Sequence, residues 1–201
     1  MVESEDDKQS ILALLKRHSI DCHRPARIEV RPYDGAEPLL DMAEIALKSD
    51  YRLGLMLDAD TSAAGRWKGI RAHFQRAGIN LPDSPAKEGT IVPGIRKEYR
   101  IGIWLMPDNV DSGKLEDFLA KLIPANDMCW PYAQTVTLEA KKHGARYRAV
   151  DTIKAQLRAW LAWQANPGLP FGTAMTEAYF RHDTPEALAF VAWFQRLFLN
   201  P

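Results

Sequence analysis

Two aspartates, Asp58 and Asp60, stand one residue apart directly after the apolar segment 53–57. Such a continuous apolar run is typical of a strand that is buried on both faces, as in a parallel sheet covered by helices. The carboxyl edge of such a sheet is where open α/β folds bind their ligands. Two carboxylates so close together repel each other unless a cation joins them, and Mg²⁺ is a suitable one. The pair therefore indicates a cation site, unless Asp60 simply begins the next helix.

Further acidic side chains occur where other predicted elements begin or end. Glu3 and Asp7 precede and enter the first predicted helix, four residues apart and so on one helical face. Asp108 follows the apolar run 101–106, and Glu116 lies in the first turns of the next helix. Stabilisation of helix dipoles is the alternative role for the acids at helix starts. The histidines show no zinc spacing, so several acids together favour Mg²⁺ or Mn²⁺.

An alternation of helices and strands would position these acids. Hydrophobic periodicity and turn signals predict helices at about 6–18, 39–47, 62–77 and 113–124, and strands at 27–31, 52–57, 90–92 and 100–106. This order predicts an α/β fold with a mostly parallel sheet flanked by helices. Four more helices are expected at 128–142, 152–164, 171–180 and 185–198. We therefore expect an α/β domain over residues 1–125 and a helical extension over residues 126–201, packed on it.

Composition narrows the class of protein. The chain has 201 residues, which suits one domain or one domain with an extension, and its 26 basic and 26 acidic residues balance. Strong global attraction to nucleic acid is therefore not expected, although residues 141–201 carry a net positive charge. There is no P-loop and no Gly-x-Ser-x-Gly motif. Two cysteines without metal spacing, no signal peptide and no membrane-spanning apolar run predict a soluble, cytoplasmic protein.

The spacing of the acidic motifs resembles the Toprim domain of topoisomerases, primases and OLD-type nucleases. Residues 2–7 (Val-Glu-Ser-Glu-Asp-Asp) and residues 57–60 (Leu-Asp-Ala-Asp) are similar to that family's two acidic motifs. Residues 113–116 (Gly-Lys-Leu-Glu), Lys154 and the acid Asp7 resemble the OLD-type nuclease branch. The whole chain is similar to an uncharacterised bacterial Toprim-like family, including its segments 104–109, 115–119 and 161–164.

The resemblance implies a fold and a chemistry. It implies one or two Mg²⁺ or Mn²⁺ ions held by Glu3, Asp7, Asp58, Asp60 and Glu116, with Asp108 as a further candidate ligand. Two such metals activate a water and stabilise the leaving oxygen in phosphodiester cleavage. Glu3 and Lys154 are the implied catalytic residues, because Lys154 can offset charge on a phosphate. The implied function is a metal-dependent DNA nuclease, with a separately encoded ATPase as partner.

Two departures from the family pattern keep other functions open. Ser4 stands where the family has glycine, and only Met1 and Val2 precede Glu3, so the first strand either starts upstream or is a short stub. These departures favour a Toprim-like regulatory or binding subunit of an ATPase-containing complex that binds Mg²⁺ without cutting. A third alternative is a receiver domain phosphorylated on Asp58, against which the helical extension argues. Arg146, Arg148 and Arg158 could follow a phosphate backbone, or be ordinary surface arginines.

Overall fold

A computed structural model describes residues 1–23, 27–49, 51–96 and 98–200. Its elements in chain order are α1 (Glu5–Arg17), α2 (Ala36–Ala46), β1 (Arg52–Asp58), α3 (Ala63–Arg76), β2 (Thr90–Pro93), β3 (Arg100–Met106), α4 (Leu115–Lys121), α5 (Cys129–Lys142), a short 3₁₀ helix (Ala149–Asp151), α6 (Thr152–Leu161), α7 (Phe171–Thr176) and α8 (Pro185–Phe198). The predicted α/β class is confirmed. Within this described part of the chain, no helix is long and apolar enough to cross a membrane.

The named strands form one small mixed sheet in the order β1-β3-β2. Strands β1 and β3 pair in parallel, and β2 pairs antiparallel with β3. The predicted strand at 27–31 is wrong, because this segment is irregular and only Pro32 beyond it forms an isolated bridge, to Val2. Its alternating pattern has another cause: Ile28 and Val30 are partly buried against the core without joining a ladder. A larger, mostly parallel sheet of the Toprim type stays a prediction.

The first two residues lie beside β1 and extend its hydrogen bonding. The ammonium group of Met1 donates to the carbonyl of Gly54 at 2.7 Å, and the N–H of Met56 donates to the carbonyl of Met1 at 3.0 Å. This is the pattern of a parallel pair, and Val2 forms a parallel bridge on its other side to Pro32. The next residue, Glu3, therefore lies at the carboxyl end of β1.

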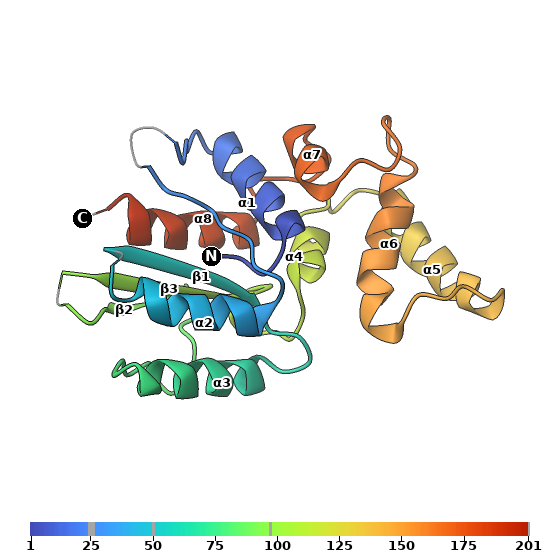
Figure 1. Cartoon of the computed structure of the whole chain (residues 1–201). Coiled ribbons are helices and arrows are strands. Elements are labelled where there is room, and N and C mark those ends of the chain that lie inside the picture. The colour runs from blue at the N-terminus through green and yellow to red at the C-terminus, as the bar shows by residue number, and fades with distance from the viewer. Residues whose placement is uncertain (24–26, 50, 97, 201) are drawn as a thin grey trace.

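Two hydrophobic clusters, one on each face of the sheet, explain why β1 and β3 are almost wholly apolar. Alternate residues of the two strands point to opposite faces. One set packs with α2 and α3, and consists of Leu53, Leu55, Leu57, Ile101, Ile103 and Leu105. The other set includes Met56, Trp104 and Met106, and packs with α1, α4 and α8. Figure 1 shows the sheet between the α2–α3 layer and the layer of α1 and α8.

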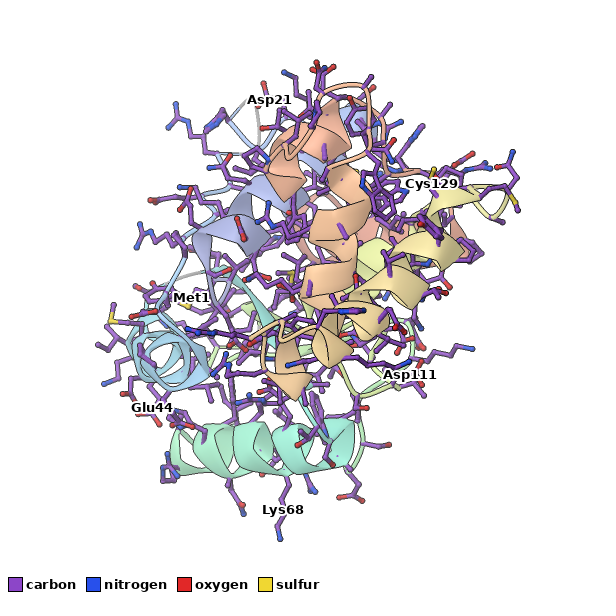
Figure 2. All side chains as sticks on the ribbon, turned by 90° about the vertical axis from the view of Figure 1, so that its right-hand side faces the viewer. Met1, Asp21, Glu44, Lys68, Asp111 and Cys129 are labelled. Carbon is purple, nitrogen blue, oxygen red and sulfur yellow. The ribbon has the colours of Figure 1, made fainter. Side chains whose placement is uncertain are left out.

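The chain after residue 125 contributes to the same core. Helix α7 packs closely on α1, and α8 lies across β1 and β3. Helices α5 and α6 pack on each other and project to one side, with α6 against α4 (Figure 1). In Figure 2, which views the molecule from that side, α5 and α6 lie in front of the α/β part. The boundary at residue 125 stays a prediction, but the hydrophobic core crosses it.

Candidate functional site

Glu3 and Asp58 meet at the carboxyl edge of the sheet. Glu3 follows the short segment beside β1, and Asp58 is the last residue of β1. The N–H of Asp58 donates a hydrogen bond to Oε1 of Glu3 at 2.8 Å. Two residues 55 positions apart are thus joined directly at the edge where α/β folds bind ligands.

A backbone bridge brings the start of α4 to the same edge. Asp60 and Gly113 exchange two backbone hydrogen bonds, each of 2.8 Å, which fasten the loop after β1 to the loop before α4. The N–H of Leu115 then donates to Oδ1 of Asp58 at 3.0 Å. The next residue, Glu116, is consequently buried beside these acids, with an exposed fraction of 8%.

The start of α1 delivers the fourth acid. Ser4 is the N-cap of α1, and its hydroxyl accepts from the N–H of Asp7 at 3.2 Å and donates to Oδ2 of Asp7 at 2.5 Å. Serine is a favourable N-cap, so Ser4 has a structural role at the start of α1. Asp7 is only 3% exposed. We call Glu3, Asp7, Asp58 and Glu116 the acidic cluster.

Burial and the repulsion of neighbouring acids disfavour the charged forms of Glu3, Asp7 and Asp58. Burial first, and then the nearby charges of Asp7, Glu3 and Glu116, together raise the pKa of Asp58 to about 8. Burial likewise raises the pKa of Asp7 to about 6 and raises that of Glu3. Among the described residues, no lysine, arginine or histidine forms an ion pair with Glu3, Asp7 or Asp58. The buried Asp7 and the partly buried Glu3 and Asp58 are therefore left without an ion-pair partner in this part of the chain.

Cations occupy the rim of the cluster instead. Arg66 on α3 forms an ion pair with Asp60, whose other oxygen lies 3.3 Å from Nζ of Lys114. Nε of Arg66 also donates to the carbonyl of Asp58 at 2.9 Å. Lys154 on α6 lies 3.1 Å from Oε1 of Glu116. The predicted catalytic lysine is thus brought to the cluster, whereas Asp60 is already neutralised by two cations.

Asp108 is not brought to the acidic cluster. Its carboxylate accepts from the backbone N–H groups of Val110 and Asp111, at 3.1 and 2.8 Å. Nζ of Lys121 lies 2.5 Å from the same carboxylate and 3.0 Å from that of Asp111. These contacts hold the turn between β3 and α4, which is a structural role.

The basic residues predicted to follow a phosphate backbone are partly engaged elsewhere. Arg148 pairs with Asp151 at 2.6 Å, and Arg158 lies 3.6 Å from Asp6 and stacks on the ring of Phe171. The sequence interpretation gave no role to Arg66 or Lys114. A signal existed only for Lys114, which belongs to the Gly-Lys-Leu-Glu motif, since the approach of Arg66 depends on how α3 packs.

The carboxylate oxygens of the acidic cluster are suitable ligands for a hard divalent cation, but the side chains are not arranged around one metal position. The cluster offers carboxylate oxygens, which Mg²⁺ and Mn²⁺ prefer. Over the residues that the structure describes, however, no three His, Cys, Asp or Glu side chains are arranged so that they could hold a metal ion. The side chains of Glu3, Asp7, Asp58 and Glu116 would therefore need to turn toward one ion.

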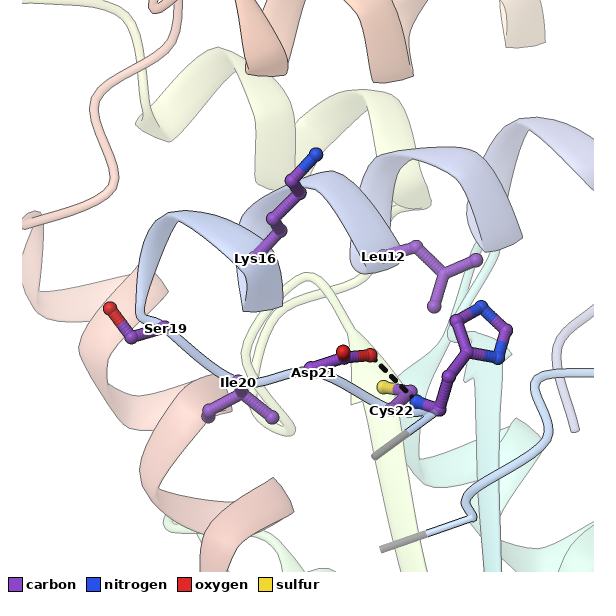
Figure 3. A pocket seen from close by; sticks show the side chains of 7 residues that line it. Leu12, Lys16, Ser19, Ile20, Asp21 and Cys22 are labelled. Atoms are coloured by element: carbon purple, nitrogen blue, oxygen red, sulfur yellow. Dashed lines mark hydrogen bonds between the residues drawn. The ribbon is translucent and has the colours of Figure 1, made fainter. Parts of the chain in front are cut away.

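A separate hollow of about 480 Å³ lies at the other end of α1 (Figure 3). It is lined by Leu12, Lys16, Ser19, Ile20, Asp21, Cys22 and His23. Burial raises the pKa of the Cys22 thiol to about 11, so the thiolate is scarce at neutral pH. The N–H of His23 is occupied by Oδ1 of Asp21 at 2.8 Å, as Figure 3 shows. Among the described residues that line this hollow, Asp21 supplies one carboxylate, whereas the acidic cluster has four.

Comparison with known proteins gives a family. A family model described as "Protein of unknown function (DUF3226)" matches residues 1–199. The chain belongs to this family. No curated protein and no solved structure matches the chain. Because the DUF3226 match spans the acidic segment at Glu3 as well as helices α5 to α8, the family includes both the α/β part and the helices after residue 125.

Proposed function

We propose that this DUF3226 protein is a metal-dependent phosphodiester hydrolase, a nuclease acting on DNA. The observation that supports this most is the acidic cluster at the sheet edge. Its four carboxylates come from segments far apart in the chain, and three of them lack an ion-pair partner among the described residues. Proteins retain such costly groups where a cation compensates them or a reaction uses them. A hydrolase that binds Mg²⁺ or Mn²⁺ accounts for both features.

In this proposal each residue of the site has a defined task. Glu3, Asp7, Asp58 and Glu116 hold the metal, which when bound would supply an activated water and stabilise the leaving oxygen. Lys154, which contacts Glu116, offsets the negative charge that develops on the phosphate. The substrate, DNA, and a separately encoded ATPase partner are carried over from the Toprim resemblance. Asp60 and Asp108 stay predicted ligands outside this proposal, because cations already neutralise both.

A cleavage assay tests the proposal. The whole chain is incubated with plasmid and with single-stranded DNA, in Mg²⁺, in Mn²⁺ and in a chelator. We expect metal-dependent cleavage that falls by at least about 100-fold in Asp58→Asn, since losing a metal ligand costs more than losing a residue behind it. The matched control is Asp108→Asn, which removes one carboxylate outside the cluster and should keep the wild-type rate. Equal rates for wild type and Asp58→Asn would contradict the proposal.

One observation favours a second function, a metal-binding subunit that does not cut. The carboxylates are not gathered into a finished site among the described residues, and Lys154 neutralises Glu116. This second function predicts that Mn²⁺ binds to the wild type but not to Asp58→Asn, while neither protein cleaves DNA under any condition. Titration calorimetry with Mn²⁺, run beside the cleavage assay, distinguishes the two functions.

A further inference from the structure

Two cations from distant parts of the chain converge on Asp60. Arg66 comes from the second turn of α3, and Lys114 from the residue before α4. The backbone of Asp60 is fixed by its two hydrogen bonds to Gly113, next to Lys114. Arg66 is fixed by its contact with Asp60 and by donation from Nε to the carbonyl of Asp58. The two cationic groups are therefore positioned by the same loops that position the acidic cluster.

Both cations keep hydrogen-bonding capacity. A guanidinium has five N–H donors and an ammonium has three. Among the described residues, the contacts of Arg66 go to Asp58 and Asp60, and the ion pair of Lys114 goes to Asp60. The side chains of Arg66 and Lys114 are 20% and 34% exposed. They can therefore donate to a further anionic group without leaving Asp60.

The space beside Asp60 and Arg66 is open. A hollow of about 560 Å³ lies between α2 and α3 and is lined in part by Asp60, Ser62, Arg66, Gly69 and Arg76. A methyl group added at Gly69 would contact nothing within 4 Å, so this part of α3 has room for a ligand. The hollow begins at Asp60 and runs along α3, which gives an extended anion a path away from the acidic cluster.

We propose that Arg66 and Lys114 bind a phosphate group of the nucleic-acid strand next to the acidic cluster, and that Asp60 holds these two cations instead of ligating the metal. The inference rests on the proposed hydrolase function, because it names how that site holds its substrate. Arginine matches the geometry of phosphate oxygens and lysine supplies a compact charge. The strand would then continue along the hollow between α2 and α3.

The test is fluorescence anisotropy with a labelled single-stranded DNA 12-mer, in chelator so that no cleavage occurs. We expect Lys114→Met and Arg66→Met each to weaken binding by about 3- to 10-fold at low salt. Each should also reduce the slope of log K against log salt by about 0.7, the value for one lost phosphate contact on a single strand. The matched controls are Lys121→Met, at the other end of α4 from Lys114, and Arg71→Met, on α3 like Arg66; each removes one positive charge. Lys121 pairs with Asp108 and Asp111, and Arg71 with Asp83, all outside the acidic cluster and away from Asp60, so the controls should bind like wild type.

The outcomes separate this inference from the proposed function. If Lys114→Met binds DNA no more weakly than Lys121→Met, the phosphate site is wrong, even when cleavage depends on Asp58. If Lys114→Met weakens binding but Asp58→Asn cleaves like wild type, only the hydrolase is wrong. Arg66→Met also removes the hydrogen bond to Asp58, so its melting temperature is measured. If Arg66→Met melts at a lower temperature than the wild type, the binding result for Lys114→Met alone tests the phosphate site.

Discussion

In a chelator at pH 8, the Asp58→Asn variant should melt at a higher temperature than the wild type. Burial, together with the charges of Asp7, Glu3 and Glu116, raises the pKa of Asp58 to about 8 in the folded protein. The ordinary value of 3.8 applies in the unfolded chain, so the folded state retains a proton that the unfolded state releases. Wild-type stability contributed by this group is therefore greatest below pH 4 and is lost as the pH rises towards 8. Removing the charge should restore about 2 kcal/mol, or roughly 4–8 °C in a chain of this size.

The design of the substitution keeps the local structure. The amide oxygen of asparagine can still accept the hydrogen bond that the N–H of Leu115 donates to Asp58. At pH 5 the difference in melting temperature should shrink, because Asp58 is then protonated and uncharged in the folded wild type. Adding Mn²⁺ should reverse the order at pH 8, since only the wild type gains stability from a bound ion.

The control is Asp60→Asn, which lies two residues away and should not stabilise the protein. Its carboxylate is paired with Arg66 and Lys114, so its loss leaves two cations facing each other. We expect no gain in melting temperature at any pH. If Asp58→Asn lowers the melting temperature at pH 8 by as much as at pH 5, the prediction that the folded protein raises the pKa of Asp58 is wrong.

The parts of the fold that were predictable are those with a strong local signal. The apolar runs of β1 and β3 predicted strands buried on both faces, and both are. The packing of α8 on β1 and β3 was not predictable from the apolar runs of these strands. Gly54 and Gly102 leave room on one face for Leu197 and Phe198, so that α8 lies directly on the sheet. This packing joins residues about a hundred or more positions apart, and no local pattern reports it.

The candidate site shows the same limit. The place of Asp58 was predictable, because a strand end fixes where the following side chain lies, whereas Glu3 was predicted as a ligand from the Toprim resemblance. The state of Asp60 was not predictable, because its neutralisation depends on the packing of α3, which places Arg66, and on the bridge between Asp60 and Gly113, which places Lys114. Asp108 was predicted as a ligand from its place after β3. It turns instead into its own loop, because the N–H groups that follow it are the nearest donors.

Gly172→Ala should destabilise the protein, because it adds a methyl group where α7 packs against α1. A Cβ at this position of α7 would lie 2.8 Å from the carbonyl carbon of Gln9 and 2.9 Å from its oxygen. These are backbone atoms of α1 and cannot rotate away, so the two helices must separate. Overpacking of this kind costs about 1–3 kcal/mol. Urea unfolding followed by circular dichroism measures the loss.

The same substitution should weaken the candidate site, although Gly172 is not part of it. Helix α1 begins at the Ser4 cap and carries Asp7 into the acidic cluster, so a shift of α1 displaces that carboxylate. Mn²⁺ affinity should fall in Gly172→Ala at temperatures where the variant is still folded. The control is Gly69→Ala on α3, where the added methyl group meets nothing within 4 Å and should instead stabilise the helix by about 0.5–1 kcal/mol. If both variants unfold at the same urea concentration, the close packing of α7 on α1 does not support the site, and the position of Asp7 must depend on the Ser4 cap and the acids around it.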